Sequence, residues 1–337
     1  MTGVQTCALP ILHAPLAWFL AAATLAFVLR TLLGAWMVRR AFHPPVFSFD
    51  GARLRRLVAE GLPFGLAMFT GVFYGRLGVL LLKGMATPSD VAFYNVGYML
   101  SQPLGFVSSA FNVSAFPSLA RSALRGPESV RPLLRRAVKF QFLAGLPLSV
   151  GLFILAPRVV PLLLKGEDFH AAGIALRVIS SGLVLIFLNL MSRYVLTALD
   201  SQRAYFHAIV VGLGANALVS AALIGRFGAA GACVGLLAGE LTVLVVCQRT
   251  LARWMRPGDL FRELGRPLVA ALAMGVVVFL LRDAPLAIVP VVGAIVYAVA
   301  VVMVRALSPE ELKLLQKVYI SFHLPGSGRM LRAANRS

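Results

Sequence analysis

Apolar stretches long enough to cross a membrane recur nine times along this chain. A helix needs about 20 mostly apolar residues to cross a hydrocarbon layer of about 30 Å. Helices also satisfy their backbone polar groups internally, which a membrane interior requires. The sequence therefore predicts an all-α, polytopic transmembrane helix bundle of about nine helices. The stretches cover roughly residues 14–37, 61–82, 91–118, 140–157, 172–192, 205–225, 228–248, 267–281 and 284–304.

The composition supports a membrane protein and argues against a soluble one. Of the 337 residues, 59% are hydrophobic and 13% are charged, whereas soluble domains carry about 25% charged residues. The net charge of +19 would indicate a nucleic-acid partner in a soluble protein, but here the charges lie in short clusters between apolar runs. We expect membrane lipids as partners, and no nucleic acid. The three cysteines are too scattered for a metal cluster, so we expect neither metal nor cofactor.

The distribution of Lys and Arg predicts the orientation in the membrane. Cytoplasmic loops carry the excess of these residues. Of the 32, 24 lie in alternate inter-helix regions, at residues 38–57, 119–139, 193–204, 249–266 and 305–337. These regions, and with them the C-terminus, are predicted to be cytoplasmic. The capping box at residues 308–311 further predicts a short amphipathic helix in the tail.

Three arginines lie inside predicted spans, Arg30, Arg76 and Arg177, and the last two are candidates for a function. Arg76 stands within GVFYGRLGVLLL, and an arginine at the centre of a span costs about 2.5–3.5 kcal/mol on insertion scales. It could face a wet cavity and hold an anionic group such as a phosphate, or it could snorkel or pair with a carbonyl. Arg177 lies about one turn into its helix on the outer side, where it could serve the substrate cavity or could simply snorkel to the interface.

Polar residues also recur within the span 91–118. Their steps of three and four residues place them on one helical face, and Pro103 predicts a kink. Such a face should line a cavity, although interhelical hydrogen bonding without transport is the alternative. The residues are Asn95, Tyr98, Gln102, Gly105, Ser109 and Asn112.

The span 228–248 combines close-packing glycines with one acid. Gly231, Gly235 and Gly239 repeat the GxxxG spacing that lets helix backbones approach closely. Glu240 follows directly. It is a candidate ion or proton site, or a protonated and hydrogen-bonded side chain. No HExxH, GxSxG or phosphate-binding loop motif occurs, so we do not expect an enzyme.

Several segments resemble the polysaccharide flippases of the multidrug/oligosaccharidyl-lipid/polysaccharide exporter superfamily. Residues 57–82 are similar to the seventh helix of that family, and shorter matches follow in order at 91–98, 115–120 and 224–232. Asn216 stands where the family usually has an Asn. Members commonly have an acid two residues after the arginine of the seventh helix, where this chain has Gly78. The missing acid puts an arginine–carboxylate ion relay at this position in doubt. Arg76 could still bind a phosphate of the substrate.

The resemblance implies two six-helix lobes around a central cavity, with two extra helices. Residues 1–11 look like translated sequencing adapter, and we expect the chain to be the downstream part of a longer protein, inactive by itself. The implied segments are 12–40, the last helix of the first lobe; 41–57, a cytoplasmic inter-lobe loop; 58–250, the second lobe; 251–265, a cytoplasmic loop; 266–305, the extra helices; and 306–337, a cytoplasmic amphipathic tail.

The resemblance also implies a function. It is the translocation, by alternating access, of a polyprenyl-diphosphate-linked oligosaccharide across the bacterial inner membrane for surface polysaccharide such as the O-antigen of lipopolysaccharide. Other polysaccharide-assembly proteins are possible partners. The alternatives are a peptidoglycan lipid-precursor flippase or drug exporter of the same superfamily and, from another class, a membrane glycan polymerase or ligase. The predicted substrate cavity contains Arg76, Asn95, Tyr98, Gln102, Ser109, Asn112, Arg177 and Asn216.

Overall fold

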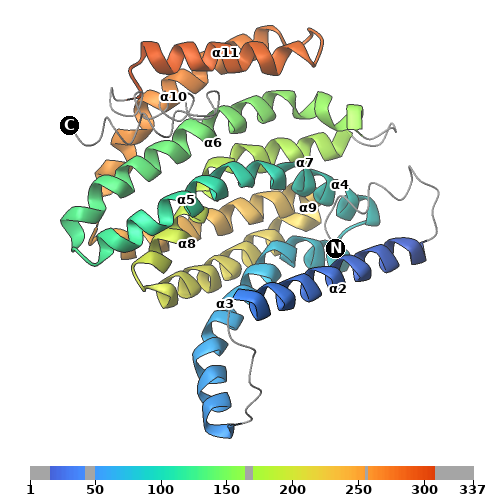
Figure 1. Ribbon diagram of the computed structural model, residues 1–337. Helices are drawn as coiled ribbons and strands as arrows, with labels where there is room; N and C mark the ends of the chain where they lie inside the picture. The colour runs from blue at the N-terminus through green and yellow to red at the C-terminus, as the bar shows by residue number, and fades with distance from the viewer. Residues whose placement is uncertain (1–15, 42–49, 164–169, 255–256, 308–337) are drawn as a thin grey trace. The chain divides into compact units, whose positions relative to one another are not determined.

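The structure is a computed structural model that describes residues 16–41, 50–163, 170–254 and 257–307. All regular secondary structure in these ranges is helical, so the all-α prediction is confirmed. The predicted tail helix lies outside the described residues. The elements are α2 (Leu16–Ala41), α3 (Gly51–Met85), α4 (Pro88–Ser101), the 3-10 turn η1 (Gln102–Leu104), α5 (Gly105–Ala123), α6 (Pro127–Leu163), α7 (His170–Ser181), α8 (Leu183–Ala198), α9 (Gln202–Leu251), α10 (Pro257–Leu280) and α11 (Ile288–Met303) (Figure 1).

The chain divides into two compact units, residues 1–66 and residues 67–337. The first contains α2 and the start of α3. Large apolar side chains of α2 are exposed along its length, including Trp18 at 70% and Phe27 at 68%. A helix with apolar side chains all round is suited to a lipid environment. The second unit contains the remaining helices and all the contacts described below.

All nine predicted spans coincide with helices, but the structure divides them differently. The span 91–118 corresponds to α4, η1 and α5, so the predicted break at Pro103 is confirmed. Helices α7 and α8 are long and apolar enough for one span only when taken together, and they are bent by 47° relative to each other. Four described helices are long and apolar enough to cross a membrane, or five spans if the bent pair is counted. The count of nine is therefore approximate.

Helix α9 is a hairpin of two helical arms. Its 50 residues would extend about 75 Å as a straight helix, far more than one crossing requires. Gly228 interrupts it with φ 51° and ψ −128°, a conformation that side chains rarely adopt. A Cβ on Gly231 would lie 2.6 Å from the carbonyl oxygen of Leu223, and a Cβ on Gly235 would collide with Ser220. The predicted close packing through these glycines is confirmed.

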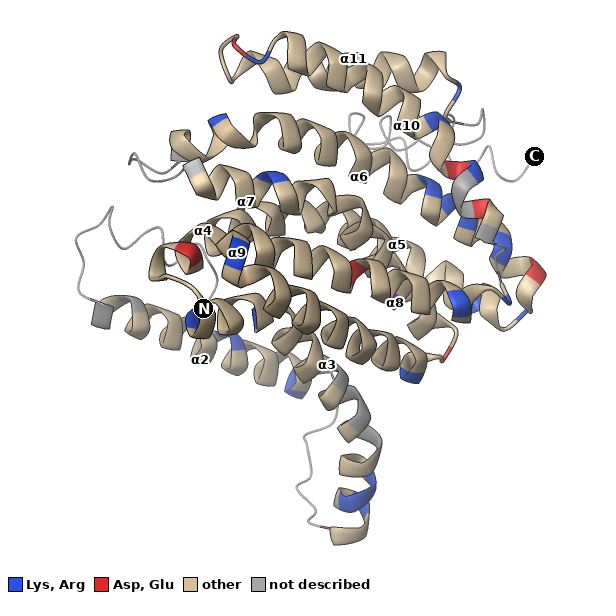
Figure 2. Cartoon of the chain, turned by 180° about the vertical axis from the view of Figure 1, so that it is seen from behind, with Lys and Arg blue, Asp and Glu red and all other residues tan. Residues whose placement is uncertain are grey.

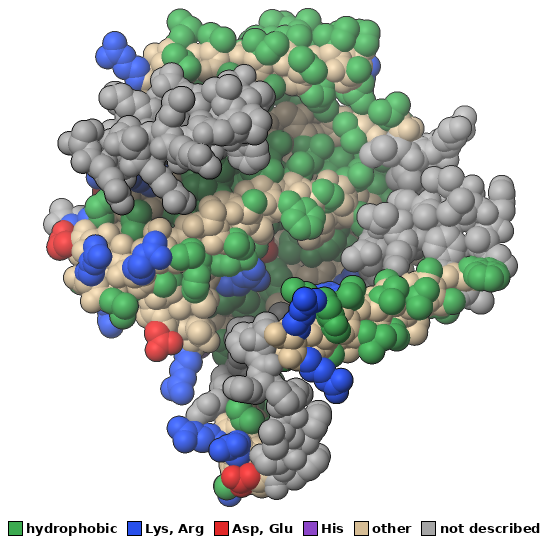
Figure 3. Space-filling model, in the orientation of Figure 1, with side chains coloured by type: hydrophobic (Ala, Val, Ile, Leu, Met, Phe, Trp, Pro, Cys, Tyr) green, Lys and Arg blue, Asp and Glu red, His purple; other side chains and the backbone are tan. Residues whose placement is uncertain are grey.

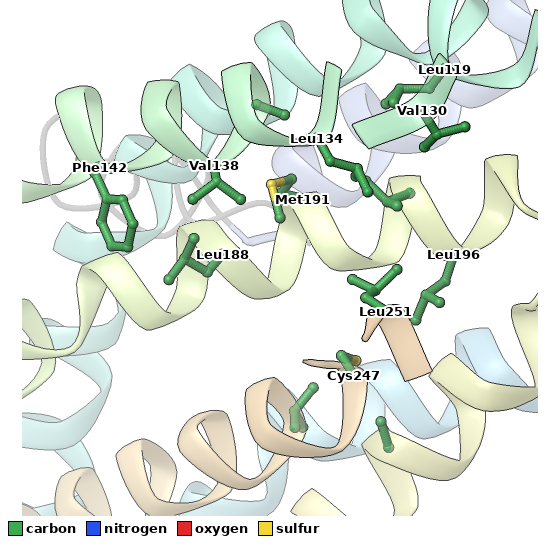
Figure 4. Packing of buried hydrophobic residues seen from close by; sticks show 14 of the residues in the cluster. Leu119, Val130, Leu134, Val138, Phe142, Leu188, Met191, Leu196, Cys247 and Leu251 are labelled. Carbon is green, nitrogen blue, oxygen red and sulfur yellow. The ribbon is translucent and has the colours of Figure 1, made fainter. Parts of the chain in front are cut away.

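The largest apolar core joins α5, α6, α8, α9 and α10. Figure 4 shows the side chains of Leu134 and Val138 on α6 directed toward α8, with Met191 between the two helices. Apolar side chains also cover much of the surface in Figure 3, including Leu218 at 75% and Met303 at 78% exposure. Surface of this kind indicates a lipid-facing exterior.

Helix α10 packs against both α6 and α11. The Tyr297 hydroxyl on α11 donates a hydrogen bond of 2.8 Å to the carbonyl oxygen of Leu143 on α6. Arg158 at the other end of α6 donates to the carbonyl oxygens of Arg282 and Ala284, in the connection between α10 and α11. These bonds attach the last two helices to the rest of the unit.

Candidate functional site

Two tyrosines of α4 pack over two glycines of α3. A Cβ on Gly78 would lie 2.6 Å from the Tyr94 ring, and a Cβ on Gly75 would lie 2.8 Å from the Tyr98 hydroxyl. The two rings are stacked, with centroids 6.0 Å apart. Position 78 is therefore covered by the Tyr94 ring, which leaves no room there for a larger side chain.

Arg76 lies on α3 between these two glycines. Its side chain is exposed and close enough to Tyr94 and Tyr98 to interact electrostatically with both. No described residue forms an ion pair with it. Arg76 is therefore a cation within an apolar helix that remains available to an anion from outside the protein.

The predicted polar face of residues 91–118 does not have uniform surroundings. Asn95 and Ser109 are partly buried and Gln102 is exposed. Asn112 is buried, and its amide donates to the Ser108 hydroxyl at 3.1 Å. The Nε2 of Gln141 on α6 donates to the Asn112 carbonyl oxygen at 3.1 Å.

This chain of hydrogen bonds continues to α8, because the Ser108 hydroxyl donates to the Phe187 carbonyl oxygen at 3.4 Å. Asn112 therefore connects helices, as in the alternative interpretation of the polar face. The sequence reasoning did not single out Gln141, although a glutamine at the edge of the apolar span 140–157 could have been recognised as a polar residue in need of a partner.

Glu240 lies at the centre of a second polar group, the Glu240 cluster. The Nδ2 of Asn189 on α8 donates to the Glu240 carboxylate at 2.6 Å and to its backbone carbonyl at 2.8 Å. The Tyr74 hydroxyl of α3 lies near the same carboxyl group without forming a hydrogen bond to it. Asn216 lies on the other arm of α9, and both its Cβ and the Tyr74 hydroxyl are within 3 Å of the place where a Cβ on Gly239 would stand. We define the cluster as Tyr74, Asn189, Asn216, Ser220 and Glu240.

The Glu240 cluster has unused hydrogen-bonding capacity. The Asn216 carbonyl oxygen accepts a bond of 3.0 Å from the Ser220 hydroxyl. Within the described part of the chain, the Tyr74 hydroxyl, Asn189 Oδ1 and Asn216 Nδ2 are buried without hydrogen-bond partners. Buried polar atoms normally have partners. A carboxylate beside unpaired oxygen atoms could hold a proton or a hard cation.

The structure thus brings together two predicted residues, Asn216 and Glu240, and adds three that sequence reasoning missed, Tyr74, Asn189 and Ser220. Asn189 is the one amide in the apolar run LVLIFLNLM, so it could have been predicted as a buried polar residue from the sequence. Tyr74 had no such signal, because its position near Glu240 depends on how α3 packs.

Arg177 is occupied by contacts with α6. Its Nε donates to the Phe153 carbonyl oxygen at 3.2 Å, and its guanidinium lies 5.4 Å from the centroid of the Phe153 ring. Pairing with a neighbouring helix was not among the roles predicted for Arg177, which were substrate binding and snorkelling. These contacts connect α7 to α6.

Comparisons with known proteins found a family match and a curated relative. Residues 6–123 match the family described as "Polysaccharide biosynthesis protein". The chain is 26% identical over 212 residues to a "Probable flippase AglR" of Haloferax volcanii, an alignment that covers 61% of this chain and 44% of that protein. The chain thus spans less than half the length of this curated relative.

Two solved structures share the fold. "Lipid II flippase MurJ, inward closed conformation" matches with a TM-score of 0.67 at 12% identity, over 80% of this chain and 59% of that one. "Crystal structure of MATE in the bent conformation" matches with a TM-score of 0.51 at 19% identity, over 73% and 63%. The chain is therefore a multi-pass membrane protein with the helical fold of these exporters, and its resemblance to the polysaccharide flippases is confirmed.

Proposed function

We propose that the protein translocates a lipid-linked oligosaccharide across a membrane for polysaccharide assembly. The observation that carries this proposal is the match of residues 6–123 to polysaccharide biosynthesis proteins. It is supported by the similarity to a probable flippase. In this proposal residues 58–250 form the second lobe of the transporter, residues 12–40 end the first, and residues 266–305 are the two extra helices.

Arg76 is the proposed binding group for the substrate phosphates. Its guanidinium is exposed on an apolar helix, and arginine binds phosphate through two parallel charge-assisted hydrogen bonds. Three side chains of the polar face predicted from the sequence, Asn95, Tyr98 and Gln102, would contact the sugars. Asn112 and Arg177 bind other helices instead, so we assign them no direct role in substrate binding.

The Glu240 cluster is the proposed site of a coupling proton or cation. The chain contains no nucleotide-binding loop motif, so we attribute the driving force to an ion gradient or to the membrane potential. A carboxyl group inside a membrane is costly unless it is paired or has a function. Binding of a proton or cation at the Glu240 cluster could change how α3, α8 and α9 pack, because side chains of all three helices meet there.

We further propose that the protein lies in the bacterial inner membrane with its C-terminus in the cytoplasm. The basis is the excess of Lys and Arg in alternate loops. The proposed substrate is a precursor of a surface polysaccharide such as O-antigen, handed over by other assembly proteins.

The proposal is tested by Arg76→Ala, expressed from the whole gene in its native host. Loss of the guanidinium removes the phosphate contact, so we expect surface glycan to fall below detection while the amount of protein in the membrane is unchanged. Lys83→Ala is the matched control, because it removes an exposed cation from the same helix. Normal glycan display in Arg76→Ala would exclude Arg76 from the site.

A further inference from the structure

Two of the predicted spans are broken near their middle. Between α4 and α5, the 3-10 turn η1 contains Pro103, which has no backbone N–H to donate. Between α7 and α8, Ser181 and Gly182 stand at the bend of 47°, and pairs of Ser and Gly are a known cause of helix kinks. We call the position of these two breaks the break level.

The contacts between the broken helices align the two breaks. Before the breaks, a Cβ on Gly97 of α4 would lie 3.0 Å from the backbone nitrogen of Leu176 on α7. After the breaks, the Ser108 hydroxyl of α5 donates to the Phe187 carbonyl oxygen of α8 at 3.4 Å. Each contact joins residues 79 positions apart, and the same offset pairs the two breaks with each other. The helices therefore pack half against half, α4 on α7 and α5 on α8.

The buried core is divided at the same level. The largest apolar core includes side chains of α5 and α8 but, among the residues that the structure describes, none of α4 or α7. Two other clusters include α4 and α7 and no described residue of α5 or α8. Figure 2 shows Lys and Arg gathered at the end of the bundle where α6 and α10 begin, and α5 ends there as well. The pair α5–α8 thus belongs to the predicted cytoplasmic half, and the pair α4–α7 belongs to the outer half.

Helix α6 crosses the break level and carries a proline there. Pro147 cannot donate a hydrogen bond to the Leu143 carbonyl oxygen one turn earlier, and the Tyr297 hydroxyl of α11 donates to that oxygen instead. Two residues after the proline, the Ser149 hydroxyl donates to the Ser180 carbonyl oxygen near the end of α7. Side-chain bonds of this kind make helix breaks tolerable inside a membrane. One continuous and two broken spans can therefore bend at the same level.

We infer that α4 and α7 turn together as one body relative to α5 and α8, with the break level as the hinge. The tip of the α9 hairpin turns with them, because the Asp90 carboxylate of α4 accepts a hydrogen bond of 3.0 Å from the Ala229 N–H. Helices α3 and α9 cross the level without a break and keep the two halves connected. The outer half can then change its tilt while the cytoplasmic core stays packed. The inference does not depend on what the protein transports.

The hinge is tested by distances between pairs of spin labels on the purified protein, whose natural cysteines are replaced. The labels are attached at exposed positions, Ala92 and Ile174 in the outer half and Ala110 and Val245 in the cytoplasmic half. An arm of about ten residues is about 15 Å long, so a turn of about 20° moves its end by about 5 Å. The distance distribution of the pair Ala92→Cys, Ala110→Cys, which crosses the break level, should be broader by up to about 5 Å than those of two pairs within one half. These two pairs are Ala92→Cys, Ile174→Cys and Ala110→Cys, Val245→Cys.

Pro103→Ala should stiffen the hinge, because it restores a backbone N–H that can bond to the Met99 carbonyl oxygen. The distribution across the break level should then narrow to the width of the other two. Pro117→Ala is the matched control, since it removes an exposed proline from α5 away from the break level, and it should leave the distribution broad. Equal widths for the three pairs without a proline change, an unchanged width in Pro103→Ala, or an equal narrowing in Pro117→Ala would overturn the inference. If Pro103→Ala does not fold, the comparison of the three pairs still decides.

Discussion

Asp90 connects the starts of two helices that are far apart in the sequence. Its carboxylate accepts a hydrogen bond of 2.7 Å from the Thr87 hydroxyl, within the capping box of α4. It also accepts one of 3.0 Å from the backbone N–H of Ala229, the first residue after the α9 turn. The pKa of Asp90 is lowered, chiefly by the Thr87 hydroxyl and also by the Ala229 N–H.

Asp90→Ala should lower the stability of the purified protein at neutral pH by about 1 kcal/mol, a typical cost of losing a capping interaction at a helix N-terminus. Because the folded-state pKa is lowered, this contribution is fully present above the ordinary carboxyl pKa, near 3.8. It is lost as the pH falls through the lower folded value. Thermal unfolding of both proteins at several pH values measures the difference. Asp283→Ala is the control, since its carboxylate is 90% exposed; an equal effect there would contradict the capping role.

Glu240 provides a test of the coupling site at the residue scale. Glu240→Gln keeps an oxygen that can accept the hydrogen bond from Asn189, but it cannot ionise. We therefore expect normal folding, measured as an unchanged elution volume and thermal midpoint, together with loss of surface glycan. Glu128→Gln alters a carboxylate that is 85% exposed and should remain active. Full glycan display by Glu240→Gln would show that ionisation at this position is not needed.

At the scale of elements, the apolar pattern predicted where helices cross the membrane but not how far they extend. Helix α6 begins at Pro127, 13 residues before the predicted span, because its first turns carry Arg and Lys outside the hydrocarbon layer. The pattern placed Asn95 and Asn112 on one face, whereas η1 separates them into different surroundings. Asp90 and Ala229, like Tyr74 and Glu240, meet only through tertiary packing, so neither pair was predictable from spacing.

The α9 hairpin depends on one glycine. Gly228→Ala would force a side chain into φ 51°, ψ −128° and against the Asp90 carboxylate. Strain of this kind costs about 1–3 kcal/mol. We expect a lower thermal midpoint in detergent. Gly225→Ala is the control, because a Cβ there meets nothing within 4 Å, and it should be neutral or mildly stabilising. Equal midpoints for the two variants would contradict the assigned turn.

At the scale of the whole molecule, orientation can be tested by cysteine labelling. In a chain whose natural cysteines are replaced, Ser201→Cys lies on the predicted cytoplasmic side and Asp283→Cys on the opposite side. A membrane-impermeant maleimide added to intact cells should label position 283 and not position 201, because only the outer side is reachable. Permeabilised cells should give labelling at both. The reverse pattern in intact cells would contradict the predicted topology.

Translocation in proteoliposomes tests the central claim most directly. The protein expressed from its whole gene is reconstituted with a fluorescent lipid-linked oligosaccharide, and an external quencher reports movement of the sugar between leaflets. The account predicts rapid translocation by the wild-type and Lys83→Ala proteins, and a rate for Arg76→Ala close to that of protein-free vesicles. Equal rates in wild-type and protein-free vesicles under an imposed ion gradient would contradict the proposed flippase function.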